Sequence, residues 1–277
     1  MFALASAIGY GVSDFVGGLA SRRVAALRVV LVSYPVSMVL LGVLAMLTGG
    51  TVSAPALYWG ALSGVCLGLG VWWLYAALGS GPISVVAPLT AVLAAAFPLG
   101  VGVAMGERPG AIAAVGSVLA MVAVVLVSRE ATDEDVRPHR FTRAVAAFTT
   151  GAGLAFGLNY VLIDQMPVDS HLWPLFFGRL AATVVIVGVA AVTGNLHPPQ
   201  GFPLRLALAA AVLDVGASIA TLLALQSMML SLAGVLMSLY PAATVVLAIV
   251  VLRERVTRWQ ALGMVLALVA VAMISLH

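Results

Sequence analysis

Three ionisable side chains, Asp14, Arg179 and Asp214, stand inside long runs of apolar residues. A charge near the centre of a bilayer costs about 2.5 kcal/mol or more, so such residues usually mark an ion pair or a cavity. Asp214 lies close to the middle of its run. Arg179 lies three or four residues from the middle of its own run, about 5 Å off centre at about 1.5 Å per residue. Arg179 and Asp214 are therefore predicted to reach one another, while Asp14 is displaced toward the opposite face.

Two interpretations of this pair stay open. Arg179 and Asp214 either form a structural ion pair that fixes two helices, or they form a cavity pair that binds a carboxylate and an amine or that titrates. Polar and aromatic residues at matching depth are predicted to line the same cavity. With the three charged residues, the candidate cavity residues are Tyr10, Ser13, Asp14, Trp72, Asn159, Arg179, Asp214 and Tyr240.

A Glu-Arg pair occurs twice, as Glu107-Arg108 in "VAMGERPG" and as Glu254-Arg255 in "VVLRERVT". A carboxylate beside the start of a helix meets the positive end of the helix dipole. The arginine that follows can place its charge at the membrane interface while its stem stays in the apolar layer. We interpret all four residues as structural turn residues, one pair on each membrane face, with a gating role as the alternative.

The composition places these residues in a membrane protein, because 63% of the chain is hydrophobic and 8% is charged. Soluble domains contain about 45–50% apolar and about 25% charged residues. A membrane-spanning helix needs about 20 apolar residues. Ten such spans are predicted, so the expected fold is an all-α membrane protein. They lie near 2–20, 29–47, 55–78, 82–105, 109–128, 144–163, 172–193, 204–226, 229–252 and 256–276.

The chain also contains an internal repeat. Residues 77–128 align with residues 224–275 at a shift of 147, with 19 identical positions out of 52. We therefore predict a first five-helix repeat over 1–128, a charged linker over 129–143 and a second five-helix repeat over 144–277. Because five is an odd number, the second repeat enters the membrane inverted relative to the first, as is typical of secondary transporters.

Each repeat ends with a small-residue-rich span, the turn "GERP" or "RERV" and a last apolar helix. In this constellation the chain resembles the EamA repeats of the drug/metabolite transporter superfamily, over almost its whole length. The resemblance implies a multi-pass protein of the inner or plasma membrane. It further implies transport of small metabolites or drugs, often their export, without ATP.

Other function classes find little support in the residues. All thirteen basic residues are arginines, so the chain has no lysine for a phosphate-binding loop or a Schiff base. The four histidines and the single Cys66 lack metal-ligand spacing. We expect no catalytic residues, no metal, no cofactor and no nucleic-acid partner. The alternative to a transporter is a membrane-embedded enzyme or a non-transporting scaffold on the same fold.

The expected partners are a small-molecule substrate and the lipid bilayer, with protons as a candidate coupling ion; a monomer and a homodimer both stay open. Orientation can be argued in two ways. Eleven arginines follow odd-numbered spans, which by the positive-inside rule places the linker in the cytoplasm and both termini outside. The family resemblance implies the opposite orientation. We prefer the arginine count, because it is read from this chain.

Overall fold

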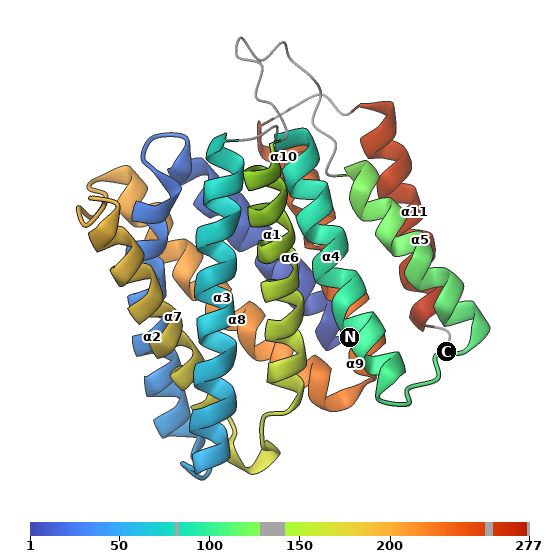
Figure 1. Cartoon of the computed structure of the whole chain (residues 1–277), viewed down its shortest axis with the longest axis horizontal. Coiled ribbons are helices and arrows are strands. Elements are labelled where there is room, and N and C mark those ends of the chain that lie inside the picture. The colour runs from blue at the N-terminus through green and yellow to red at the C-terminus, as the bar shows by residue number, and fades with distance from the viewer. Residues whose placement is uncertain (81–82, 128–141, 253–256, 276–277) are drawn as a thin grey trace.

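The computed structural model describes residues 1–80, 83–127, 142–252 and 257–275. These residues are helical with short connections, which confirms the all-α prediction for the described part of the chain (Figure 1). The helices are α1 (Phe2–Ser21), α2 (Ala26–Thr48), α3 (Ala54–Ser80), α4 (Ile83–Ala104), α5 (Ala111–Val127), α6 (Arg143–Asp164), the short 3-10 helix η1 (Val168–Ser170), α7 (Trp173–Val192), α8 (Phe202–Ser227), α9 (Leu230–Met237), α10 (Tyr240–Leu252) and α11 (Arg258–Ser275).

Length and composition suit these helices to a membrane. Seven stretches within the described residues are long and apolar enough to cross a bilayer, and one of them runs over α9 and α10 together. Three shorter apolar helices accompany them, at Leu89–Ala104, Ala111–Val127 and Arg258–Ile274. The length and hydropathy of its helices thus indicate an integral membrane protein.

The helices lie roughly side by side and give the molecule two ends (Figure 1). At one end, lowest in Figure 1, α1 begins, α4 ends and α9 begins; we call it the α9 end. At the other end α1 and α5 finish and α2, α6 and α8 begin. We call this second end the arginine-rich end, because it carries Arg22, Arg23, Arg28, Arg143, Arg205 and Arg258.

The predicted span 229–252 is not one continuous helix. It is broken at Ser238 and Leu239, between α9 and α10. Pro241 explains the break, since a proline has no backbone N–H to donate and its ring clashes with the carbonyl four residues earlier, here that of Met237. Pro241 instead occupies the first turn of α10, where a missing donor costs little.

The two ends are packed differently. Every residue of α9 is buried, and α9 belongs to a large core cluster with residues of α1, α2, α4, α5, α6, α7, α8 and α11. Toward the arginine-rich end the buried apolar residues form smaller separate clusters, such as Ala20, Val29 and Ala207 at the ends of α1, α2 and α8. The large cluster continues along α5 to Val124, but the other helices pack as one body at the α9 end and in smaller groups at the other.

Glycines allow the closest helix contacts. A Cβ atom added to Gly64 on α3 would collide with the carbonyl oxygen of Gly178 on α7. One added to Gly9 on α1 would lie 2.9 Å from the Cβ atom of Ala217 on α8. Such small-residue contacts let helix backbones approach each other in a membrane, where apolar burial drives association weakly. They set the distance between the helices that carry the charged residues.

Candidate functional site

Arg179 and Asp214 form an ion pair between α7 and α8. The Nη2 atom of Arg179 lies 2.7 Å from the Oδ2 atom of Asp214. The Arg179 side chain is 4% exposed and that of Asp214 is 17% exposed. Because a guanidinium stays protonated in proteins, the carboxylate compensates a charge that could not otherwise remain in this environment.

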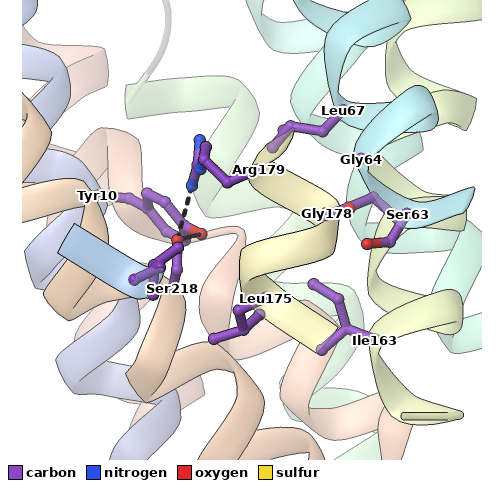
Figure 2. A pocket seen from close by; sticks show the side chains of 11 residues that line it. Tyr10, Ser63, Gly64, Leu67, Ile163, Leu175, Gly178, Arg179 and Ser218 are labelled. Atoms are coloured by element: carbon purple, nitrogen blue, oxygen red, sulfur yellow. Dashed lines mark hydrogen bonds between the residues drawn. The ribbon is translucent and has the colours of Figure 1, made fainter. Parts of the chain in front are cut away.

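Hydroxyl groups extend the pair into a network across four helices. Arg179 Nη2 also donates to Ser218 Oγ at 2.9 Å, and that hydroxyl lies 3.2 Å from the hydroxyl of Tyr10 on α1 (Figure 2). Ser37 on α2 donates to Asp214 Oδ2 at 3.1 Å. The network therefore ties α1, α2, α7 and α8 to one charged centre.

The two terminal nitrogens of the Arg179 guanidinium differ in their hydrogen bonding: Nη2 has partners, whereas Nη1 has none among the described residues. Its Cζ atom stands 4.7 Å from the ring centroid of Tyr34, a cation–π distance. Its Nη1 atom is buried and has no hydrogen-bond partner among the described residues. A buried donor without a partner is costly, at about 1–3 kcal/mol, so Nη1 is a position at which an added acceptor would be stabilising.

A small cavity adjoins this network. Its volume is about 30 Å³, which is room for about two water molecules. Arg179 lies beside Tyr10 and Ser218, and Ser63 of α3 lies on the opposite side from Tyr10 (Figure 2). The lining residues are Tyr10, Leu41, Ser63, Gly64, Leu67, Asn159, Ile163, Leu175, Gly178, Arg179 and Ser218. A metabolite is larger than this volume, so the cavity in this conformation has room for water and not for such a molecule.

Residues 144–276 match the family model described as the EamA-like transporter family. This part of the chain is similar to that family. The match confirms the resemblance drawn from the sequence for residues 144–276. A comparison with curated proteins gives no match.

The fold of this chain is also found in solved structures. One crystal structure of a protein superposes with a TM-score of 0.77 at 16% sequence identity. The comparison covers 98% of this chain and 98% of that chain. At this identity the likeness concerns the fold alone, and it extends over almost the whole chain.

Asp14 lies on the inward face of α1 in this EamA-like chain, one turn after Tyr10. It is exposed, and a Cβ atom added to Gly17 or Gly18 in the following turn meets nothing within 4 Å. Its carboxylate is within electrostatic range of Asp214 and of tyrosines on α3, α6 and α10, namely Tyr75, Tyr160 and Tyr240. Asp14 is therefore accessible from the interior of the helix bundle, on the side toward the arginine-rich end.

The structure brings some of the predicted cavity residues to the network and not others. Tyr10 and Asn159 line the cavity with Arg179. Ser13 is used in a helix contact, since its hydroxyl donates to the backbone oxygen of Ala210 at 3.0 Å. Tyr240 begins α10 and is half-buried, outside the cavity lining.

Trp72 does not line this cavity as predicted. It is 38% exposed and lies on the same face of α3 as Val65, seven residues earlier, which is 37% exposed. Glycines on other faces of α3, such as Gly64 and Gly70, contact α7 and α6. Depth in the span could not distinguish a cavity wall from the outer surface, because both occur at the same depth.

The predicted turn residues fall into two groups. Glu107 does meet a helix N-terminus, but it is that of α9 and not that of α5, which follows it in sequence. Arg108 is exposed beside it. Glu254 and Arg255 lie outside the described residues.

Tyr34, Ser37 and Ser218 belong to the network and were not predicted from the sequence. Ser218 stands four residues after Asp214, and residues four apart share a face of a helix. This spacing was a usable signal for Ser218. Tyr34 and Ser37 lie on α2, a span without any charge at its centre, so nothing in their own surroundings pointed to the pair.

Proposed function

We propose that this protein is a secondary transporter that moves small metabolites or drugs across the cell membrane, as an exporter. In this proposal two inverted five-helix repeats enclose a site near the midplane. Arg179 and Asp214 are its charged pair, and Asp14 stands beside the route to the arginine-rich end. Substrate or proton binding exchanges with the contact between Arg179 and Asp214.

The unpartnered Nη1 atom of Arg179 is the observation that carries the proposal. A purely structural pair would be expected to use the donors of its buried guanidinium within the protein. Here one donor is left unpaired among the described residues, on a residue that lines a cavity with Tyr10, Asn159 and Ser218. An acceptor on a substrate would satisfy it.

The arrangement of the helices supports an inverted repeat. α1 begins at the α9 end, whereas α6, its counterpart, begins at the arginine-rich end (Figure 1). The packing supports access from one side, because the core is continuous at the α9 end and divided toward the other. Exposed Asp14 lies on the divided side. This is the arrangement expected for a transporter open toward one membrane face.

Proton coupling would act through Asp214. While its carboxylate is charged, it holds Arg179 Nη2. Protonation removes the charge that pairs with the guanidinium, which frees Arg179 to bind an anionic group. Release of that proton would restore the ion pair and expel the group. The pair thus offers a direct exchange between proton and substrate.

The test compares single and double substitutions of the pair in reconstituted vesicles. A panel of candidate metabolites is first screened for a rise in Tm of the purified protein, and a stabilising compound is then used for flux. Asp214→Asn leaves the buried charge of Arg179 unpaired, which typically costs about 3–5 kcal/mol. Arg179→Gln leaves the partly exposed carboxylate of Asp214 unpaired, which should cost less. We expect the double variant to regain stability and still to lose flux per folded molecule.

The same series separates a structural pair from a functional one. A double variant that is stable and keeps its flux would show that the pair only fixes two helices. For proton coupling, Asp214→Asn should lose the dependence of flux on a pH gradient while exchange of substrate remains. Asp169→Asn, a change of the same kind outside the spans, serves as the matched control and should leave both readouts unchanged.

A further inference from the structure

Glu107 joins the two repeats at the α9 end. Its Oε1 atom accepts a hydrogen bond from the backbone N–H of Leu230 at 2.7 Å, and Oε2 accepts one from the N–H of Ser231 at 2.9 Å. These N–H groups belong to the first two residues of α9, where a helix leaves its donors unsatisfied and its dipole is positive. One carboxylate of the first repeat thus binds a helix of the second at two points.

The contact between Glu107 and α9 depends on space left by a glycine, Gly102. A Cβ atom added to Gly102 would collide with Glu107 Oε2 and would lie 3.0 Å from the backbone nitrogen of Ser231. Gly102 therefore makes the room in which the carboxylate and α9 meet. The residue at the matching position of the second repeat is Ile249, so this feature belongs to one end of the molecule only.

The helix that Glu107 holds is the one that fills the α9 end. All eight residues of α9 are buried, and α9 packs against α4, the helix that leads into Glu107. The break at Ser238 and Leu239 separates α9 from α10, so α9 can move without carrying α10 as one rigid rod. The side-chain oxygen of Ser231, beside the contact, is buried and has no hydrogen-bond partner among the described residues.

We propose that the contact between Glu107 and the N-terminus of α9 is a releasable closure of the α9 end, and that access from that end begins when its two hydrogen bonds break. Charge-assisted hydrogen bonds are strong enough to keep the end closed, yet they join separate parts of the chain and can break without loss of either helix. The inference rests on the proposed function in one respect, since it assumes that access alternates between the two ends.

Cysteine reactivity can test this without any substrate. The single Cys66 is replaced by Ala, and a cysteine is placed at one of two reporter positions. Ser231→Cys reports on the α9 end, where it is buried, and Gly18→Cys reports on the other end, where it is exposed. A water-soluble maleimide is applied to purified protein in lipid nanodiscs, where both faces are accessible.

Three variants weaken the closure in different ways. Glu107→Gln removes the charge and keeps the shape, Glu107→Ala removes both acceptors, and Gly102→Ala displaces the carboxylate while Glu107 stays in place. Gly100→Ala is the matched control on the same helix, because a Cβ atom there meets nothing within 4 Å.

For Glu107→Ala and Gly102→Ala we expect the Ser231→Cys reporter to react at least about tenfold faster, which corresponds to about 1.4 kcal/mol. The Gly18→Cys reporter should react several-fold more slowly, and Glu107→Gln should give smaller shifts in the same directions. Gly100→Ala should leave both rates unchanged.

Three results would overturn the closure. Unchanged rates at position 231 would show that the contact does not hold the end closed. A rise at 231 with an unchanged rate at 18 would show only fraying of a helix cap. Loss of folding in all three variants would show that the contact is needed for the fold and is not releasable. None of these readouts depends on flux, so failure of the closure and failure of the proposed function are distinguishable.

Discussion

The fourth helix of the first repeat and its counterpart in the second repeat differ although their sequences align. α4 runs without interruption from Ile83 to Ala104, whereas the matching stretch is divided into α9 and α10. Ala94 occupies the position that matches Pro241. Among the positions at which the two stretches differ, this one has a direct bearing on helix continuity.

The difference makes the two ends of the molecule unequal in structure. The break leaves α9 as a short buried element at one end of the molecule, where Glu107 of the first repeat holds its N-terminus. α4 lies on the other side of this contact, because the chain runs from its last turn to Glu107. The continuous helix α4 and the first part of the divided stretch, α9, therefore meet at the α9 end.

The largest effect is expected from Ala94→Pro, which introduces the break into α4. Proline at 94 would remove the hydrogen bond to the carbonyl of Thr90 and clash with it, at a cost of about 3 kcal/mol or more. Ala94 is also buried, at 5% exposure, so the ring has little room. The readout is the Tm of the purified protein, which should fall strongly.

The control for this change is Ala111→Pro, at the first residue of α5, where proline is tolerated. We expect little change in Tm for that variant. If Ala94→Pro were as stable as the control, the continuity of α4 would not matter to the fold, and the contrast with α9 and α10 would lose its meaning.

A smaller effect is expected where the two helices carry the same residue. Leu236 on α9 and Leu89 on α4 occupy matching positions, but Leu236 is buried at 4% exposure and Leu89 is only partly buried. Removing a buried leucine side chain leaves a cavity and typically costs about 2–5 kcal/mol. Leu236→Ala should therefore lower the free energy of unfolding by about 1 kcal/mol more than Leu89→Ala does. Equal losses in a denaturant titration would contradict the view that α9 is the more tightly packed element.

Most of the fold was readable from the sequence because it follows from composition and repetition. Apolar runs of bilayer length predicted the helices, and the uncharged boundaries near 78–84 and 227–233 coincide with the ends of α3 and α8. The break inside 229–252 was missed, although Pro241 was its signal. A proline within a span can bend the helix, break it or leave it continuous, depending on the neighbouring residues. α4 contains Pro98 and is continuous.

The site was readable only in part, for a geometric reason. Depth along a helix follows from residue number, so the meeting of Arg179 and Asp214 could be predicted. Direction around the helix axis was not used, and this misplaced Trp72 on a cavity wall. Contacts between distant elements, such as Glu107 with α9, depend on how the two repeats dock, which no local pattern records.

A still smaller change in stability is expected from Pro241→Ala, the reverse of Ala94→Pro. Alanine supplies the missing N–H, which can then donate to the carbonyl of Met237 and join α9 to α10. We expect slower hydrogen exchange of the amide of Leu239, which in the native protein donates to the oxygen of Leu236 three residues earlier at 3.3 Å. Exchange is measured by mass spectrometry, and the change in stability should be less than about 1 kcal/mol.

The opposite outcome for Pro241→Ala would assign the break to another cause. α1 approaches closely here, because a Cβ atom added to Gly11 would lie 2.7 Å from the backbone oxygen of Tyr240. If exchange stayed fast, the packing of α1 against Tyr240 would be what keeps the helix divided. The proline would then permit the break without imposing it.

The last prediction concerns orientation, that is, which membrane face the α9 end occupies. The substitutions used for it are not expected to change stability. Six described arginines lie at the opposite end, whereas Arg108 lies at the α9 end. By the positive-inside rule the α9 end should face outward. In a Cys66→Ala background, cysteine is introduced at Val52, exposed between α2 and α3 at the α9 end, or at Gln200, exposed between α7 and α8 at the arginine-rich end. An impermeant maleimide applied to intact cells should label position 52 and not position 200. Labelling of 200 alone would give the orientation implied by the family resemblance. The divided helix would then close the cytoplasmic face, and the side exposed near Asp14 would open outward.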